Sequence, residues 1–265
     1  MSDARAAKPV WKSPSTILIT GATGGIGAAL ARCYAGPDRT LILHGRDSAR
    51  LDALSRECES LGARVIGVVH DLRDCAGAVG VFREASRAHR IDLAIVNAGV
   101  AHSIGAGEEV ECWDVGREVL AVNLDGALAT VAAVLPDMRR RAAGQIAFIS
   151  SLAAYYGLPI TPIYCASKAA LKAYGEALRG WLAPEGIAVS VVLPGFVRTP
   201  MMERFPRATL WAQSPHQAAL RIRRGLAANK ARIAFPGALA FGSWWLAVLP
   251  AALSQRLVRA FGYGP

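Results

Sequence analysis

The sequence has few groups that could hold a metal ion or a disulfide framework. Its five cysteines are scattered, no Cys-x-x-Cys pair occurs, and its five histidines form no cluster at ligand spacing. We therefore predict no metal site, and cysteines used in this way are typical of reduced thiols in a cytoplasmic protein. The first fifteen residues contain no apolar core of signal-peptide length, so we interpret residues 1–14 as a flexible N-terminal arm.

Acidic residues are nearly absent from the last quarter of the sequence. Residues 196–265 contain ten basic side chains and one acid, Glu203, whereas the preceding 195 residues contain 20 basic and 19 acidic side chains. The net charge of +10 is thus concentrated in the tail. A basic segment attracts anionic lipid, acidic carrier proteins or nucleic acid. No aromatic–basic platform or nucleic-acid motif accompanies this charge, so we predict no nucleic-acid partner.

Apolar residues make up 53% of the 265, enough to bury a sizeable core. Short apolar, β-branched runs alternate with segments of helical spacing. The expected strands are 15–20, 40–44, 64–70, 91–96, 145–150 and 188–193, and the expected helices are 26–35, 51–61, 76–88, 108–141 with a break near Gly116, and 164–182. Continuously apolar strands that alternate with helices are typical of a parallel sheet covered on both faces. We predict one α/β domain over residues 15–265, a Rossmann-type doubly wound parallel sheet in a three-layer α/β/α arrangement.

A glycine-rich turn joins the first expected strand to the first expected helix. The segment from Thr20 to Gly27 reads TGATGGIG. Glycines let the backbone turn tightly and approach a pyrophosphate, and a helix N-terminus offers free N–H groups and a positive dipole. The turn therefore predicts a dinucleotide site, although the glycines taken alone also fit a plain strand-to-helix turn.

The end of the second expected strand bears on the choice between nicotinamide cofactors. It reads His44-Gly45-Arg46, with no carboxylate to accept the ribose hydroxyls. Arg46 offers a planar fork of donors suited to a 2′-phosphate, so we predict NADP(H) in preference to NAD(H). The alternative is that Arg46 is a solvated loop residue, next to Asp47.

Tyr164 and Lys168 lie one turn apart on the same face of an expected helix. Of the six tyrosines, only Tyr164 has a lysine four residues later. A nearby ammonium favours the phenolate, so the pair predicts an acid/base group. Ser150 and Ser151 end the fifth expected strand, at the edge where open α/β folds bind ligands. A serine there could hold a substrate oxygen beside the tyrosine, or it could simply mark the start of a loop.

Four segments together resemble the short-chain dehydrogenase/reductase family. They are TGATGGIG, Asn97-Ala98-Gly99, Ser151 thirteen residues before Tyr164, and YCASK; the segment PGFVRTP from Pro194 to Pro200 is also similar. The resemblance covers residues 16–200. It implies that Ser151 positions the carbonyl, that Tyr164 transfers the proton and that Lys168 lowers the tyrosine pKa and holds the nicotinamide ribose. It also implies that Asn123 supports a water-linked proton relay.

The same resemblance implies a set of cofactor contacts. Asp71 is expected at the adenine, Asn97 on the adenosine side and Thr199 at the nicotinamide carboxamide, although Asp71 and Asn123 could each be a capping or helix-surface group. The implied cofactor-binding residues are Gly21, Thr23, Gly24, Gly25, Ile26, Gly27, Arg46, Asp71, Leu72, Asn97, Ala98, Gly99, Tyr164, Lys168, Pro194, Gly195, Val197 and Thr199. By the same resemblance, the helices at 108–141 and 164–182 form a homodimer or homotetramer interface.

Beyond Pro200 the sequence diverges from the family pattern. Residues 200–215 predict a substrate lid, and its Met and Phe side chains favour an apolar substrate. In the tail at 230–265, a strand at 232–236 precedes an uncharged stretch with Trp244 and Trp245 that is too short and too interrupted to cross a bilayer. One interpretation is that this stretch closes the substrate pocket or packs in an oligomer. The other is that it forms an interfacial helix that associates weakly with a membrane. We expect a cytoplasmic protein, which in the second case would lie at the inner face of that membrane.

These patterns lead to a functional hypothesis. We expect an NADP(H)-dependent oxidoreductase that transfers a hydride between nicotinamide and the carbonyl or secondary alcohol of a small, hydrophobic molecule that is lipid-, acyl- or steroid-like. Two alternatives remain: an NADPH-binding sensor without turnover, and an epimerase or dehydratase on the same fold.

Overall fold

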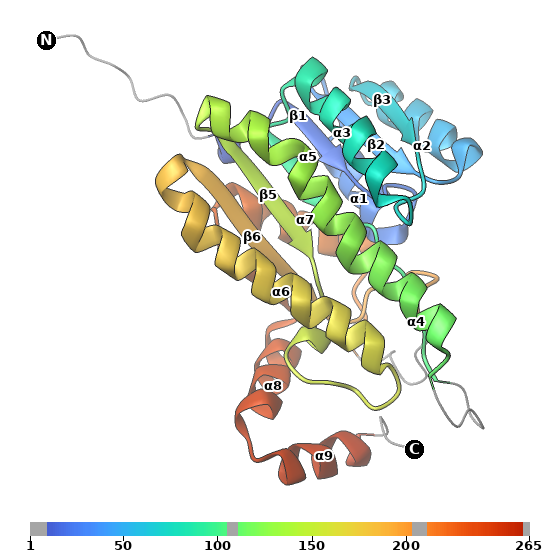
Figure 1. Ribbon diagram of the computed structural model, residues 1–265, viewed down its shortest axis with the longest axis vertical. Coiled ribbons are helices and arrows are strands. Elements are labelled where there is room, and N and C mark those ends of the chain that lie inside the picture. The colour runs from blue at the N-terminus through green and yellow to red at the C-terminus, as the bar shows by residue number, and fades with distance from the viewer. Residues whose placement is uncertain (1–9, 105–110, 203–210, 262–265) are drawn as a thin grey trace, which may run out of the picture.

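A computed structural model describes residues 10–104, 111–202 and 211–261 (Figure 1). The strands are β1 (Thr16–Ile19), β2 (Thr40–Gly45), β3 (Arg64–Val69), β4 (Leu93–Val96), β5 (Gly144–Ile149), β6 (Ile187–Pro194) and β7 (Arg232–Phe235). The α-helices are α1 (Gly25–Tyr34), α2 (Ser48–Ser60), α3 (Cys75–His89), α4 (Trp113–Leu120), α5 (Gly126–Arg141), α6 (Pro162–Leu182), α7 (Pro215–Ala227), α8 (Gly237–Val248) and α9 (Ala251–Ala260). Shorter helical segments are η1 (Val10–Lys12), the π-helical η2 (Ala121–Asp125), η3 (Leu152–Ala154) and η4 (Ala183–Glu185).

The seven strands form one parallel sheet in the order β3-β2-β1-β4-β5-β6-β7. Ile17 of β1 pairs with Leu41 of β2 on one side and with Leu93 of β4 on the other. The strand order therefore reverses between β1 and β4, and a ligand crevice is expected at the carboxyl ends of these strands. The predicted fold, a single Rossmann-type domain with a doubly wound parallel sheet in three layers, is confirmed.

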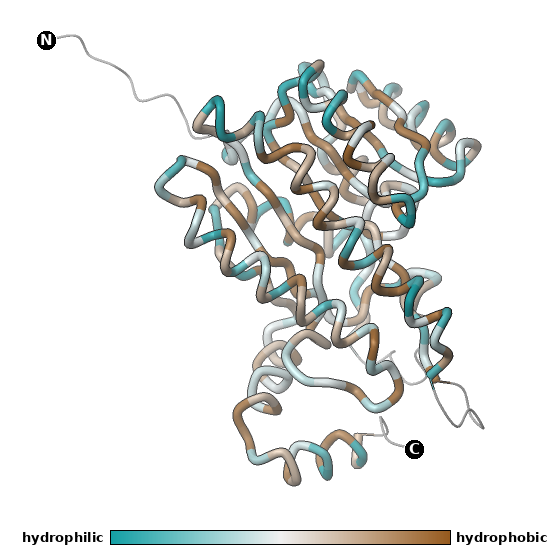
Figure 2. The backbone as a smooth tube through the Cα atoms, in the orientation of Figure 1, coloured by the Kyte–Doolittle hydropathy of each residue, from teal (hydrophilic) through white to brown (hydrophobic). Residues whose placement is uncertain are grey.

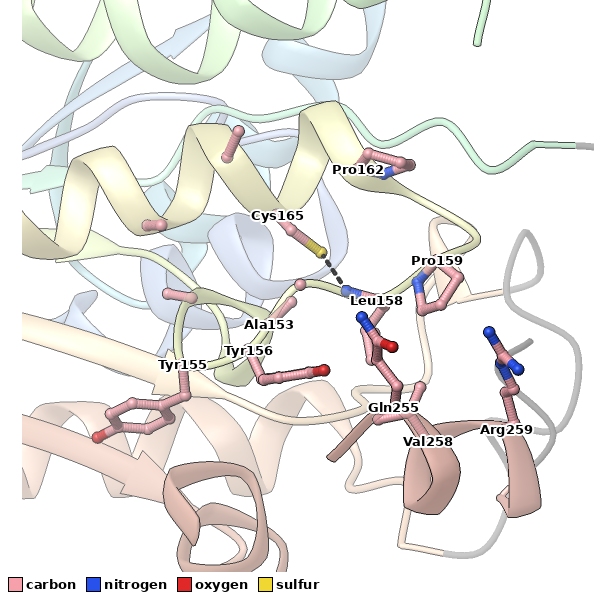
Figure 3. Close-up of a pocket in the computed structure, with 14 residues that line it drawn as sticks. Ala153, Tyr155, Tyr156, Leu158, Pro159, Pro162, Cys165, Gln255, Val258 and Arg259 are labelled. Atoms are coloured by element: carbon pink, nitrogen blue, oxygen red, sulfur yellow. Dashed lines mark hydrogen bonds between the residues drawn. The ribbon is translucent and has the colours of Figure 1, made fainter. Parts of the chain in front are cut away.

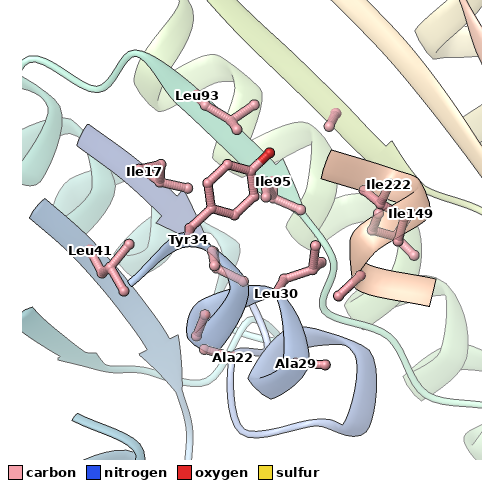
Figure 4. Close-up of a cluster of buried hydrophobic side chains, with 14 of the residues drawn as sticks. Ile17, Ala22, Ala29, Leu30, Tyr34, Leu41, Leu93, Ile95, Ile149 and Ile222 are labelled. Carbon is pink, nitrogen blue, oxygen red and sulfur yellow. The ribbon is translucent and has the colours of Figure 1, made fainter. Parts of the chain in front are cut away.

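Helices cover both faces of the sheet, which explains why the strands are apolar throughout. Ile17 and Ile19 face a layer formed by α1, α2 and α7, whereas Leu18 faces the layer formed by α3, α5 and α6. Figure 1 shows α5 and α6 crossing in front of the sheet, with α7 behind it. Leu30 and Tyr34 of α1 lie over the first of these clusters (Figure 4).

The long helical segment that ends at Arg141 differs from its sequence-based expectation. No break occurs at Gly116, which is buried in α4 against the side chain of Ile163, so the glycine there permits close helix packing and does not end a helix. The irregularity comes later, in η2, where the Gly126 N–H bonds to the Ala121 carbonyl five residues earlier. The predicted start of this helix at residue 108 lies outside the described residues.

Two other predicted segments are only partly described. In the predicted arm, residues 10–12 form a 3₁₀ turn and Arg39 donates to the Ser13 hydroxyl at 2.9 Å, whereas residues 1–9 lie outside the description. In the predicted lid, residues 203–210 also lie outside it. Helix α7 was not predicted; it begins with a capping box in which Ser214 and Gln217 bond each other's backbone N–H groups, at 3.2 and 3.1 Å.

We expect the contact of α6 with the sheet to depend on a glycine. A Cβ added at Gly175 would lie 2.6 Å from Val191 Cγ2 and 2.9 Å from Phe148 Cδ2, whereas nothing lies within 4 Å of a Cβ at the exposed Gly180. Gly175→Ala should therefore lower the free energy of unfolding by about 1–3 kcal/mol through overpacking. The matched Gly180→Ala should raise it by about 1 kcal/mol, because alanine is the better helix former. Denaturant unfolding of both variants tests this, and equal effects would contradict the proposed contact.

Candidate active site

The turn after β1 packs directly against the chain that leaves β4. Gly21 has a φ of +62°, and a Cβ on it would lie 2.7 Å from Ala98 Cα. A side chain at this position would thus be strained both by the backbone conformation and by the contact. The two segments meet where the strand order reverses, so the predicted glycine turn and the Asn97-Ala98-Gly99 segment lie together.

The N-terminus of α1 is open to an anion. Its N-cap residue, Gly24, is exposed and has no side chain, and the first turn contains no acid. The first N–H groups of the helix and the positive end of its dipole are therefore available, which fits a dinucleotide pyrophosphate. Thr199 lies beside this turn: a Cβ on Gly25 would approach to 2.9 Å from Thr199 Cβ.

Asn97 holds the glycine turn from the side of β4. Its Nδ2 donates to the carbonyls of Thr20 and Gly21 at 2.9 and 3.0 Å. Its backbone N–H and that of Ala98 both donate to the Thr20 hydroxyl, at 2.9 and 3.1 Å. The amide of Asn97 thus braces the turn, and its expected role on the adenosine side stays a prediction.

His44 was missed by sequence reasoning, and it braces the same turn from β2. The Gly21 N–H donates to His44 Nδ1 at 3.2 Å, so the proton sits on Nε2, which donates to the His70 carbonyl at 3.0 Å. Burial lowers the pKa of His44 to about 4 and keeps the ring neutral. The sequence feature that could have identified His44 is a polar residue inside an otherwise apolar strand.

Arg46 belongs to a small charged cluster at the end of β2. It is largely exposed, and its Nη1 lies 4.0 Å from the Glu118 carboxylate, which is also 3.8 Å from Arg73 Nη1. Arg73, which was not singled out, pairs with Asp71 at 2.6 Å, and its hydrogen bonds lower the pKa of Asp71 to about 2. Asp47 caps α2 by accepting from the Arg50 N–H at 3.0 Å. The cluster thus contains two arginines, and Asp47 is used as a helix cap.

The remaining predicted cofactor residues line up along the carboxyl edge or beneath it. Leu72 is buried under Gly126, and Val197 is buried after β6. The Gly195 N–H donates to the Phe235 carbonyl at 2.8 Å, which ties the segment after Pro194 to β7. The other members lie in the segments already described: Thr23 and Ile26 in the glycine turn and α1, and Gly99 after β4.

Tyr164, Lys168 and Ser151 come together where β5 ends and α6 begins. The Lys168 ammonium lies 5.7 Å from the centre of the Tyr164 ring and donates to the Ile149 carbonyl at 3.0 Å. The Ser151 hydroxyl is hydrogen-bonded to the Tyr164 side chain. Ser150 has a different use: its hydroxyl is buried and donates to the Lys168 carbonyl at 2.7 Å. Of the two serines, only Ser151 therefore faces the tyrosine.

Asn123 is fully buried inside the π-helical turn η2. Its Oδ1 accepts from the Val100 N–H at 2.7 Å, and its Nδ2 donates to the Val100 carbonyl and the Ser167 hydroxyl at 2.9 and 3.0 Å. A Cβ on Gly99 would lie 3.2 Å from both Asn123 Oδ1 and Lys168 Nζ. Asn123 and Lys168 are thus neighbours across a glycine, and π-helical turns of this kind recur at functional sites.

Burial sets the protonation of the tyrosine and the lysine. It raises the pKa of Tyr164 to about 12, with the Ser151 hydrogen bond opposing the rise. It lowers the pKa of Lys168 to about 8. The expectation that Lys168 lowers the tyrosine pKa stays a prediction, because burial dominates the shift. A protonated phenol beside a largely charged ammonium is a proton donor whose conjugate base has a cation close by.

A cavity of about 700 Å³ lies between the segment after η3, the outer face of α6 and helix α9 (Figure 3). Its walls are mostly apolar, with Leu158 and Val258 facing each other across it, and Arg259 as its charged lining residue. Cys165, next to Tyr164 in sequence, points into it and accepts from the Leu158 N–H at 3.2 Å. The cavity adjoins the site, although the tyrosine itself does not line it.

Comparison with known proteins places these features in a family. Residues 15–209 match the family model described as short chain dehydrogenase. An uncharacterized oxidoreductase from Myxococcus xanthus is 33% identical over 92% of this chain and 96% of its own length.

Solved structures are similar over most of the chain. A short-chain dehydrogenase from Sphingobium yanoikuyae in complex with NADPH has a TM-score of 0.76 and 28% identity, over 92% of both chains. A 3-oxoacyl-[acyl-carrier protein] reductase from Brucella melitensis with bound NAD has a TM-score of 0.73 and 26% identity, over 85% of this chain and 92% of its own.

His44 should make the stability of the protein depend on pH. Its folded pKa of about 4 lies below the ordinary value of 6.5, so the unfolded chain takes up the proton first as pH falls. The contribution of neutral His44 to the free energy of unfolding is present above pH 6.5 and is lost towards pH 4. The free energy of unfolding should therefore fall by about 2 kcal/mol between pH 7 and pH 5. Denaturant unfolding at both pH values should show this loss in the wild type and not in His44→Gln. Equal pH dependence in the two proteins would contradict it.

Proposed function

Because this chain belongs to the short-chain dehydrogenase/reductase family, whose members are nicotinamide-dependent oxidoreductases acting on CH–OH and C=O groups, we propose that Tyr164 is its acid/base and that it prefers NADP(H). The observation that carries the proposal is the grouping of Tyr164, Lys168 and Ser151 at the carboxyl edge of the sheet, next to the Ala98-Gly99 segment that packs against the glycine turn.

In the reductive direction, the proton comes from Tyr164. Its pKa of about 12 keeps the phenol protonated at neutral pH, so it can donate to the oxygen on which negative charge develops. Lys168, with a pKa of about 8, is mostly charged at pH 7 and stabilises the phenolate that is left. Ser151 holds the substrate oxygen beside the phenol. The bound nicotinamide supplies the hydride.

Asn123 has a positioning role in this scheme. Its side chain is committed to Val100 and Ser167, so it shapes the π-helical turn next to Lys168. In the proposed scheme, a water at that turn returns the proton to the lysine. The intact group of Tyr164, Lys168 and Ser151 argues against a cofactor sensor without turnover. The segment between β6 and β7 is short for a lobe that binds a nucleotide sugar, which argues against an epimerase.

The preference for NADP(H) is supported by the two arginines at the end of β2. Arg46 and Arg73 both approach Glu118, and both carry guanidinium forks that can bind a 2′-phosphate. Asp47, the carboxylate next to Arg46, is occupied as the cap of α2. Solved relatives are described with NADPH and with NAD, so the local charges are the basis of the choice in this chain.

We also propose a hydrophobic substrate and a homo-oligomer. The apolar cavity beside the site, about 700 Å³ in volume, can receive the non-reacting part of a lipid-, acyl- or steroid-like molecule. The helices expected at the oligomer interface carry exposed tryptophans, Trp113 on α4 and Trp181 on α6. The five cysteines are free thiols, which favours the cytoplasm as the compartment.

Tyr164→Phe tests the acid/base assignment. Turnover should fall by a factor of about 10²–10⁴, the contribution typical of a positioned proton donor, while NADPH binding is retained. Tyr174→Phe, on the same helix and packed edge-on against Phe148, is the matched control and should keep its activity. NADPH oxidation and NADPH fluorescence titration measure the two quantities. Most of the activity surviving in Tyr164→Phe would refute the mechanism.

Arg46→Asp tests cofactor selectivity. Loss of a charge-assisted contact of about 1.5–3 kcal/mol should raise the KM for NADPH about 10- to 100-fold and leave the KM for NADH unchanged or lower. Arg56→Asp, at an exposed position of α2, makes the same charge change and should affect neither constant. If Arg46→Asp changes both KM values equally, Arg46 is only a solvated loop residue.

A substrate panel tests the chemical class. NADPH oxidation by the wild type should be faster with long-chain ketones, 3-oxoacyl thioesters and steroids than with short-chain ketones, because the apolar cavity rewards burial of the longer molecules. Equal rates along a homologous series of ketones would argue against use of the cavity by the substrate.

A further inference from the structure

Helix α8 is apolar, uncharged and without a single buried residue. One side attaches it to the domain: Leu239 and Ala240 pack beside η3, and a Cβ on Gly195 would lie 2.9 Å from Leu239 Cδ2. The opposite side carries Phe241, Trp244, Trp245 and Val248, with exposed fractions of 61%, 43%, 44% and 53%.

These four residues form one continuous stripe. Their spacing of i, i+3, i+4 and i+7 places them on the same face of the helix. The three rings touch one another, with centroids 5.5–6.1 Å apart. We call this set of four side chains the aromatic stripe. Exposed apolar surfaces of this kind mark interaction sites in folded proteins.

Helix α9 follows α8 at the same end of the molecule and adds positive charge. Ser254 donates to the Leu246 carbonyl at 2.8 Å and so fastens α9 to α8, while Arg256 and Arg259 are exposed. After Glu203 the sequence contains nine arginines and lysines and no aspartate or glutamate. Figure 1 shows both helices projecting from the lower end of the molecule, beyond the sheet, and Figure 2 shows apolar residues along α8 there.

We propose that the aromatic stripe and the basic side chains of α9 dock this protein onto an anionic lipid surface. Tryptophan rings favour the headgroup depth of a bilayer, and arginines in the helix that follows are attracted by anionic headgroups. The tail offers no carboxylate to repel that surface. A second copy of the tail is a poorer partner, because two such ends would bring like charges together with no acid to pair them.

The length of α8 fits a helix that lies in the membrane–water interface and does not cross the bilayer. Helix α8 has 12 residues, about 18 Å at the usual rise, well short of a hydrocarbon core about 30 Å thick. The segment Trp113–Arg141 is long and apolar enough to cross a bilayer, but 56% of its most apolar window is buried within the domain. Because Arg259 and Val258 also line the cavity, docking brings that cavity to the lipid boundary.

Sedimentation with vesicles tests the proposal on the full-length protein. The wild type should pellet with phosphatidylcholine vesicles that contain phosphatidylglycerol and not with phosphatidylcholine alone, and added salt should release it. Trp244→Ser/Trp245→Ser should lower the partition coefficient at least about tenfold, since both rings leave the interface. Arg256→Gln should lower it about fivefold, the effect of one basic residue near an anionic surface.

Matched variants separate the possible causes. Trp211→Ser removes a tryptophan that is 59% exposed elsewhere and should bind vesicles as the wild type does. Tyr164→Phe should also bind normally, so failure of the redox proposal and failure of docking are distinguishable. Absence of binding to anionic vesicles, or equal binding by the Trp244/Trp245 variant, overturns the proposal. A lipid-independent dimer that this variant abolishes, seen by sedimentation velocity without vesicle binding, assigns the stripe to a second copy and also overturns it.

Discussion

Helix α6 is held at the end of β5 by two hydrogen bonds that run in opposite directions, and the placement of Tyr164 beside Ser151 depends on them. The Lys168 ammonium donates to the carbonyl of Ile149, and the Ser150 hydroxyl donates back to the carbonyl of Lys168. Gly175, two turns further on, lets the helix come close to the sheet. With α6 held in this way, Tyr164 faces Ser151 across the carboxyl edge. The buried lysine therefore has a structural use as well as an electrostatic one.

The cofactor end of the crevice is preorganised by uncharged groups. Thr20, Asn97 and His44 hold the glycine turn through hydrogen bonds, and none of the three brings a charge to the start of α1. The helix N-terminus thus remains the dominant local field for a pyrophosphate. Among the described residues, a charged cluster that includes Arg46 and Arg73 lies at the end of β2, apart from these bracing groups. The proposed selectivity for NADP(H) therefore rests on other residues than those that hold the turn.

The tail has features that bear on both interpretations that its sequence left open. Helix α9 lines the cavity next to η3 and α6 through Val258 and its neighbours, a feature that the first interpretation would use. Helix α8 uses one side, around Leu239, to attach to the domain and leaves the aromatic stripe on the other side uncovered, which is the observation behind the second. One short segment can do both because a helix presents different residues on opposite faces.

The amino-acid sequence by itself determined the layered fold, the glycine turn and the pairing of Tyr164 with Lys168, because strand apolarity, turn composition and the i, i+4 spacing are local patterns. The capping box of α7 is a local pattern of the same kind. The family resemblance also chose Ser151 over Ser150. Only the tertiary structure decided the uses of His44, Arg73 and Gly116. His44 and Gly116 contact partners 23 or more residues away, and Arg73, although paired locally with Asp71, meets Arg46 only through Glu118. Sequence spacing carries no information about such distant contacts.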